Sequence, residues 1–163
     1  MIEQAEVELA NRHGRLHPSQ RGKLLDLNFW VAAVLVVAGL VVAVLLAAVA
    51  ETAAEVLGTL VPILAITAWF AFVCWRRLAD VRSGQLVATT GWTHDFGRQR
   101  PEGDYPIALS TRLSQGYHEH YYLKAGGRIR PVERKLRERI QPDRTNTVYT
   151  TPRSKLLINV LPA

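Results

Sequence analysis

Two long stretches without charged residues, separated by only five residues, constrain the fold of this chain more than any other feature. Residues 29–50 are 22 uncharged, mainly aliphatic residues, and residues 56–75 are 20 more. At a rise of about 1.5 Å per residue, each stretch forms a helix of about 30 Å, the hydrocarbon thickness of a bilayer. The connecting residues 51–55, ETAAE, are sufficient only for a turn. The sequence therefore predicts an antiparallel pair of transmembrane helices.

Two other interpretations of these stretches fit less well. A secretory signal peptide would have a shorter apolar stretch nearer the N-terminus, and a second apolar stretch would not follow it directly. Two helices buried in a soluble protein would each show a polar face, which neither stretch has over about 20 residues. A membrane hairpin is therefore the favoured interpretation.

Basic residues are distributed unevenly along the chain and predict its orientation. The 163 residues include 20 Lys and Arg against 14 Asp and Glu, a formal net charge of +6. Residues 29–75 contain no Lys or Arg, whereas residues 76–163 contain 16 of the 20. Because basic flanks stay in the cytoplasm, we expect an inner-membrane protein that crosses the bilayer twice, with both termini in the cytoplasm.

Particular residues of the hairpin are predicted to lie at the membrane surface or between the helices. Indole rings and basic groups favour the headgroup region, which indicates a membrane-interface role for Trp30, Trp75, Arg76 and Arg77. Small residues permit close helix packing in a bilayer. Five of them recur at helical spacing: Gly39, Ala43, Ala47, Ala65 and Ala68. They would pack the hairpin internally or hold copies of the chain together as a homo-oligomer.

The segments next to the hairpin are predicted to be helical. Residues 1–28 are expected to form a cytosolic segment in which residues 1–13 are a short, weakly amphipathic helix or a frayed tail, followed by a helix that runs from Pro18 into the membrane. Residues 76–83 should extend the second apolar helix, and Gly84 is suited to end it as a left-handed cap.

Residues 84–163 show a different pattern, typical of a small β-rich cytosolic domain. Short segments alternate between polar and apolar residues, Gly126-Gly127 predicts a hairpin turn, and residues 133–140 have helical spacing. A small barrel or strongly bent sheet leaves few open strand edges. The expected fold is therefore a membrane α-helical hairpin plus a small, mainly β, barrel-like domain of α+β type.

Three short motifs in the C-terminal part resemble those of a known group of proteins. They are GQLVATTG at residues 84–91, YYLKAGG at residues 121–127 and VYTTPRSKLL at residues 148–157. In this order after two apolar stretches, they resemble uncharacterised bacterial membrane proteins with a helical hairpin and a small cytosolic β domain. NfeD-like proteins, with membrane spans before an OB-type barrel and a denser glycine pattern, are a more distant analogue. The resemblance implies this architecture and no catalytic residues.

No group of residues in the sequence predicts catalysis. A lone cysteine, Cys74, excludes a disulfide within the chain and any zinc site with two cysteines. The G-x-S-x-G, phosphate-binding and dinucleotide-binding motifs are missing from the sequence. We therefore expect a protein that is not an enzyme and has no cofactor. His118 and His120 would share one face of a strand and, with His94, are the weak candidates for metal binding.

A run of basic residues follows the predicted hairpin turn: Arg128, Arg130, Arg134, Lys135, Arg137 and Arg139. Attraction to anionic lipid headgroups fits the expected topology. A solvated charged face without a ligand is the favoured interpretation, attraction to lipid comes second, and nucleic acid, stacked on nearby tyrosines, is the least favoured partner.

The predicted function is that of a non-enzymatic scaffold or adaptor. It would present a basic β domain to an unknown protein partner at the cytoplasmic membrane surface. The alternatives are an accessory subunit of a membrane transport or secretion complex, and a membrane-tethered module that binds metal or nucleic acid weakly.

Overall fold

The computed structural model describes residues 2–49, 52–99, 103–113 and 119–163, and its contacts divide the chain into two compact units. Residues 18–84 form one unit, here called the hairpin unit. Residues 1–17 and 85–163 together form the other, the sheet unit. The amino-acid pattern instead predicts a boundary after residue 28. The two boundaries differ because composition does not reveal which part of the chain an N-terminal helix packs against.

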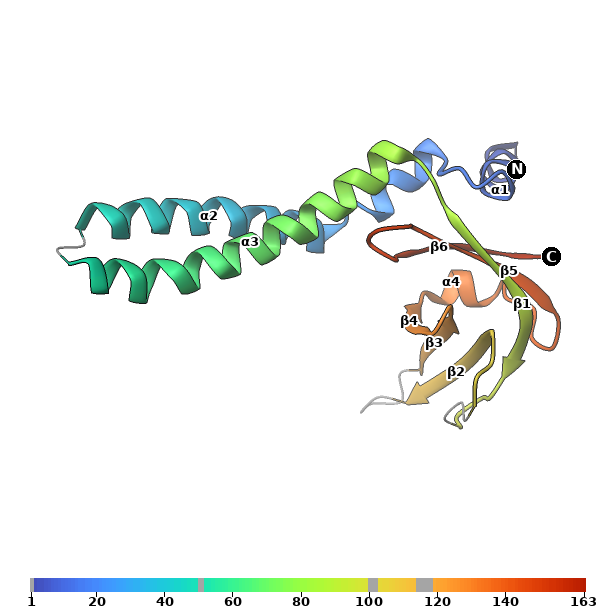
Figure 1. Cartoon of the computed structure of the whole chain (residues 1–163). Coiled ribbons are helices and arrows are strands. Elements are labelled where there is room, and N and C mark those ends of the chain that lie inside the picture. Colours follow the sequence, from blue (N-terminus) through green and yellow to red (C-terminus); the bar gives the residue numbers. More distant parts are fainter. Residues whose placement is uncertain (1, 50–51, 100–102, 114–118) are drawn as a thin grey trace. The chain divides into compact units, whose positions relative to one another are not determined.

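The hairpin unit consists of a short 3₁₀ helix and two long helices (Figure 1). The 3₁₀ helix η1 covers Pro18–Lys23, α2 covers Leu27–Val49 and α3 covers Ala53–Ser83. Both α2 and α3 are long and apolar enough to cross a membrane. As predicted, α3 ends at Gly84, which has a left-handed φ of 60°.

One prediction about this unit is wrong, since no continuous helix runs from Pro18 into α2. The 3₁₀ helix η1 ends at Lys23, and α2 begins separately at Leu27. The carboxylate of Asp26 accepts a hydrogen bond of 2.9 Å from the Phe29 N–H. This bond satisfies one of the free donors at the start of a helix, so Asp26 acts as the cap of α2.

Helices α2 and α3 pack along one continuous seam. Its positions follow alternating spacings of three and four residues, the pattern of a left-handed coiled coil. All of them are buried or half-buried: Phe29, Ala32, Val36, Gly39, Ala43 and Leu46 on α2, and Leu60, Ile63, Thr67, Phe70, Cys74 and Arg77 on α3. Gly39 and Ala43 thus lie between the helices as predicted small residues, whereas Ala47, Ala65 and Ala68 are exposed.

The described residues of the sheet unit form two helices and six strands. Helix α1 covers Ile2–Arg12, and the short helix α4 covers Arg134–Arg137. The strands are β1 (Val87–Asp95), β2 (Ile107–Leu113), β3 (Glu119–Ala125), β4 (Arg128–Val132), β5 (Thr145–Thr150) and β6 (Leu157–Pro162). They form one mixed sheet of order β4-β3-β2-β1-β5-β6, in which β1 and β2 are parallel and the other neighbours antiparallel.

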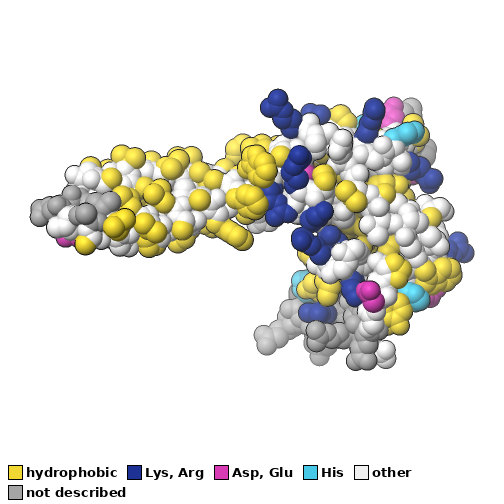
Figure 2. Space-filling view, in the orientation of Figure 1, with side chains coloured by type: hydrophobic (Ala, Val, Ile, Leu, Met, Phe, Trp, Pro, Cys, Tyr) yellow, Lys and Arg dark blue, Asp and Glu magenta, His cyan; other side chains and the backbone are white. Residues whose placement is uncertain are grey.

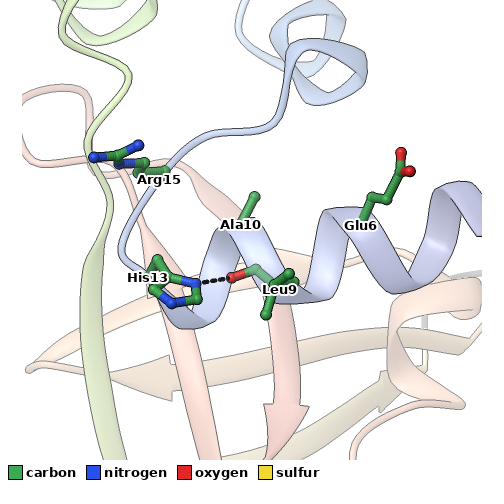
Figure 3. A pocket seen from close by; sticks show the side chains of 5 residues that line it. All are labelled: Glu6, Leu9, Ala10, His13 and Arg15. Atoms are coloured by element: carbon green, nitrogen blue, oxygen red, sulfur yellow. Dashed lines mark hydrogen bonds between the residues drawn. The ribbon is translucent and has the colours of Figure 1, made fainter.

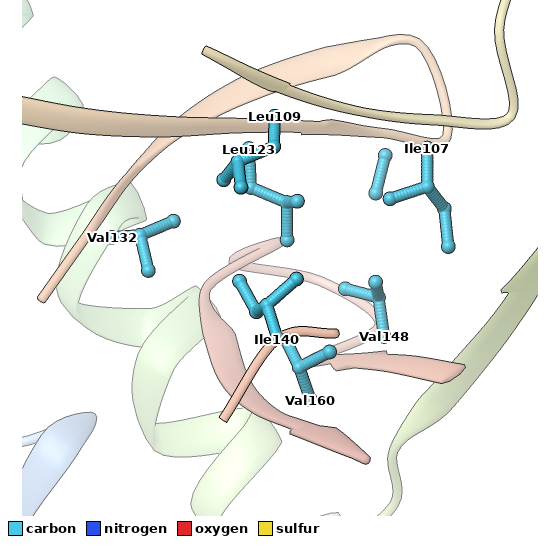
Figure 4. Packing of buried hydrophobic residues seen from close by; sticks show 8 residues of the cluster. Ile107, Leu109, Leu123, Val132, Ile140, Val148 and Val160 are labelled. Atoms are coloured by element: carbon cyan, nitrogen blue, oxygen red, sulfur yellow. The ribbon is translucent and has the colours of Figure 1, made fainter. Parts of the chain in front are cut away.

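This sheet curls into a half-barrel whose concave face holds the core (Figures 1 and 4). The prediction of two long apolar helices followed by a small β domain is therefore confirmed, in the form of an open curled sheet. Its buried cluster consists of Ile107, Leu109, Leu123, Ala125, Val132, Ile140, Val148 and Val160. Gly126 and Gly127 have φ values of 56° and 72°, as the predicted two-residue turn between β3 and β4 requires.

Helix α1 contacts β6 on the face opposite the core. Successive residues of a strand point to opposite faces, so Asn159 faces away from the core that contains Val160. The side chain of Asn159 donates a hydrogen bond of 2.9 Å to that of Asn11, and both residues are buried. Arg139 forms an ion pair with Glu8. Polar contacts therefore join α1 to this part of the sheet.

Backbone contacts also join the segment after α1 to the segment before β1. The Leu86 N–H donates a hydrogen bond of 2.8 Å to the Gly14 carbonyl oxygen. Arg15 and Gln85 form an antiparallel bridge. The chain therefore leaves the sheet unit and returns to it at neighbouring points, with the hairpin unit inserted between them.

Substitution of Gly39 by alanine tests the seam between α2 and α3. A Cβ at this position would lie 2.1 Å from Thr67 Oγ1 and 3.2 Å from Thr67 Cβ. Because overpacking of this kind costs about 1–3 kcal/mol, we expect Gly39→Ala to lower the thermal midpoint of the protein in detergent. Gly58→Ala is the matched control, since no atom lies within 4 Å of a Cβ there. Equal shifts for the two variants would contradict the seam.

Substitution of Asn11 by alanine tests the attachment of α1. It leaves the buried Asn159 amide without the side chain that accepts its hydrogen bond, a loss of about 1–3 kcal/mol. We therefore expect a lower denaturant midpoint, measured by circular dichroism of the full chain in micelles. The exposed Gln4 of the same helix is the control position, where alanine should change stability by less than about 0.5 kcal/mol. A midpoint for Asn11→Ala equal to that of the control would show that this contact adds no stability.

Candidate membrane interface

The long helices of the hairpin unit expose apolar side chains along most of their surface. Val34, Val37 and Val44 are 63–69 % exposed, and only 11 % of the most apolar window of each helix is buried. The core helix of a soluble protein would instead be mostly buried. Hydrophobic side chains also cover the face of the hairpin that is visible in Figure 2. Such a surface is suited to hydrocarbon, since the backbone polar groups of a helix are bonded internally.

Aromatic and basic side chains gather at one end of the hairpin unit. The Cys74 thiol donates a long hydrogen bond to the Phe29 carbonyl oxygen, with 3.9 Å between the sulfur and the oxygen. These two residues therefore lie at one level along the hairpin. Trp30 and Trp75, the next residue of each helix, are therefore also close to one level and are 59 % and 56 % exposed. The Arg76 guanidinium lies 5.6 Å from the centre of the Phe72 ring, which stacks on Trp75.

Arg77, the fourth residue predicted at the interface, is bonded within the hairpin unit. It forms an ion pair with Asp26 and donates a hydrogen bond of 3.2 Å to the Leu24 carbonyl oxygen. Burial raises the pKa of Asp26, but hydrogen bonds from the Phe29 N–H and from Arg77 outweigh it, so this pKa lies below its ordinary value. Arg77 therefore connects α3 to the start of α2, while Trp30 and Trp75 are exposed and Arg76 is half-buried.

Three of the six basic residues predicted to bind an anionic surface are bonded within the sheet unit. Arg137 pairs with Asp95 at 3.1 Å, and Arg139 pairs with Glu8. Arg130 donates to two backbone carbonyl oxygens, those of Lys155 (2.8 Å) and Ala125 (2.9 Å). No sequence pattern predicts these contacts, because each joins parts of the chain that are distant or belong to different strands.

The other three basic residues are exposed. Arg134 lies 3.5 Å from Glu138, one helical turn away, and both side chains of this pair are largely exposed to solvent. Arg128 and Lys135 are exposed and belong to none of the ion pairs in the described part of the chain. The predicted basic cluster is therefore divided between three residues bonded within the sheet unit and three exposed residues.

Of the histidines proposed as metal ligands, the two that the structure describes, His94 and His120, are not brought together. His94 lies beside Ala108 of β2, which in turn lies beside Lys124 of β3. His120 is four residues from Lys124, about 13 Å along the strand. The His94 ring instead packs against Tyr105, with 4.6 Å between ring centres. His118 lies outside the described residues, and no group of three His, Cys, Asp or Glu in the described ranges has metal-binding geometry.

A cavity of about 510 Å³ lies beside α1 and offers little chemistry (Figure 3). It is lined by Glu6, Leu9, Ala10, His13 and Arg15. The His13 ring nitrogen Nδ1 lies 2.8 Å from the Leu9 carbonyl oxygen and therefore serves the end of the helix. The lining places no nucleophile next to a base, so it does not suggest a catalytic site.

The Asp26–Arg77 pair predicts a specific pH dependence of stability. Because the folded-state pKa of Asp26 is lowered, its contribution is present above the ordinary carboxyl pKa and is lost as the pH falls through the lowered value. We expect Asp26→Asn to lower the thermal midpoint at pH 7 and to weaken its decline below about pH 4. Asp104→Asn, at a fully exposed side chain, is the control. If both variants kept the wild-type pH profile, the pair would not stabilise the hairpin.

Comparisons with known proteins found no protein similar to this chain. The chain matches no protein-family model, no curated protein and no solved structure.

Proposed function

We propose that this chain is an integral membrane protein whose helices α2 and α3 cross the bilayer as a hairpin. The apolar surface of both helices supports this proposal, and so does the level at which Trp30 and Trp75 lie. About 30 Å of hydrocarbon corresponds to about 20 helical residues. Helix α2 has 23 residues and α3 has 31, so α3 would extend beyond the hydrocarbon on its C-terminal side, where Arg76 and Arg82 follow.

The two chain segments that make up the sheet unit support an even number of membrane crossings. Residues 1–17 and 85–163 flank the hairpin on both sides in the sequence and yet belong to one unit. The bond between Leu86 and Gly14 directly joins the two flanks. A folded unit built from both flanks must lie on one side of a bilayer, so the two helices would cross it in opposite directions.

The charges next to the helices favour the cytoplasm as that side. Arg21 and Lys23 precede α2 and are exposed, and the exposed Arg82 lies in the last turn of α3. At the other end of the hairpin, Glu55 is the charged residue in the described part of the loop and first turn. Excess Lys and Arg on one side is the usual determinant of a cytoplasmic orientation.

We infer the role of a membrane-anchored scaffold or adaptor without catalytic activity. The anchor sets the location, and the sheet unit would present its surface to a protein partner. Several buried polar groups of this unit have structural partners: Asn146 donates to Thr93 (2.9 Å), and the hydroxyls of Thr151 and Ser154 are 2.7 Å apart. Extraction of the chain in a stable complex with a transporter or secretion component would instead support the role of accessory subunit.

Cysteine accessibility tests the proposed topology. In a Cys74→Ala background expressed in bacteria, single cysteines replace the exposed residues Glu3, Thr52 or Ala163. We expect a membrane-impermeant maleimide to label Thr52→Cys from outside intact spheroplasts, and to label Glu3→Cys and Ala163→Cys only after the membrane is opened. Alkaline carbonate should leave all three variants in the membrane fraction. Labelling of Glu3→Cys and Ala163→Cys on opposite sides, or release by carbonate, would contradict the proposal.

A further inference from the structure

One corner of the sheet unit brings together basic residues from two distant parts of the chain. Arg128 and Arg130 are two residues apart on β4 and therefore point to the same face of the strand. The Arg130 Nε–H donates to the Lys155 carbonyl oxygen over 2.8 Å, which brings Lys155, just before β6, next to β4. We call Arg128, Arg130 and Lys155 the cationic corner.

The position of the Arg130 guanidinium is fixed by the backbone. Besides Nε, its Nη1 donates to the Ala125 carbonyl oxygen over 2.9 Å and to that of Arg128 over 3.4 Å. Its Nη2 forms no hydrogen bond with the residues that the structure describes. These carbonyl partners are neutral, so they orient the group and leave its charge uncompensated.

The lack of a carboxylate sets Arg130 apart from other half-buried guanidiniums of the same unit. Arg137 and Arg139 are also half-buried, and they pair with Asp95 and Glu8, respectively. No ion pair in the described part of the chain involves Arg128, Arg130 or Lys155. Burial and the nearby Arg128 lower the pKa of Arg130, which shows that its charge is disfavoured there. An anion at the corner would compensate it.

We propose that the cationic corner binds a phosphate group, whether from a soluble phosphate compound or from a lipid headgroup with a terminal phosphate. A guanidinium with a free Nη2 donor matches the oxygens of a phosphate, and Lys155 adds a point charge. This proposal goes beyond membrane anchoring and does not depend on the orientation of the hairpin.

Two double variants of equal charge separate this site from general electrostatic attraction. Arg128→Gln with Lys155→Asn removes two charges from the corner and leaves the hydrogen bonds of Arg130, which go to backbone oxygens. Asparagine is chosen because Lys155 has a left-handed φ of 59°, which asparagine tolerates. Arg134→Gln with Lys135→Gln is the matched control, since both side chains are exposed on α4.

The test measures thermal unfolding of the full chain in neutral detergent at constant ionic strength. We expect inorganic phosphate, or micelles containing phosphatidic acid, to raise the midpoint saturably. The half-saturating concentration should rise about tenfold in the corner variant, as expected for the loss of a charge-assisted hydrogen bond, and stay unchanged in the control.

The two ligands distinguish the source of the phosphate. A response to inorganic phosphate indicates a soluble compound, and a response to phosphatidic acid alone indicates a lipid headgroup. An equal response to phosphatidylserine, equal losses in both double variants, or no response to either phosphate source would overturn the proposal. None of these results bears on membrane insertion, which the cysteine labelling tests separately.

Discussion

The contact of the segment after α1 with the segment before β1 is the constraint on which the rest of this architecture depends. The bond from Leu86 to Gly14 and the bridge between Arg15 and Gln85 hold the two flanks of the hairpin unit together. With Asn11 bonded to Asn159, they make residues 1–17 part of the sheet unit. The apolar hairpin is consequently an insertion into a folded domain, and the proposed location of both flanks on one side of the membrane follows from this connection.

Within the inserted hairpin, polar groups are satisfied locally and the outer surface remains apolar. The Thr67 hydroxyl donates to the Ile63 carbonyl oxygen over 2.8 Å, one turn earlier on α3, and faces Gly39 of α2. At the end of the seam, Asp26 both caps α2 and pairs with Arg77. The seam positions of the two helices thus pack against each other, while exposed Ala47, Ala65 and Ala68 remain on the outer faces.

Local features of this fold could be predicted from the sequence, whereas contacts between distant segments could not. Apolar length predicted α2 and α3, and the conformational freedom of glycine predicted the end of α3 and the turn at Gly126-Gly127. Asn11 and Asn159 are 148 positions apart, and the presence of an asparagine at either position does not predict such a contact. For the same reason the run of arginines suggested one basic surface, although the fold directs Arg130, Arg137 and Arg139 to partners elsewhere in the sheet unit.

Hydrogen exchange of the full chain in micelles, compared with that of a chain lacking residues 1–17, tests this account most directly. Removal of α1 takes away the hydrogen-bond partner of the buried Asn159 on β6, which lies beside the buried Tyr149 on β5. The account predicts that backbone amides of β5 and β6 lose protection, while those of β2 and β3 and of the hairpin seam keep more of theirs. Identical protection of β5 and β6 in the two chains would contradict it, because the N-terminal segment would then not belong to the sheet unit.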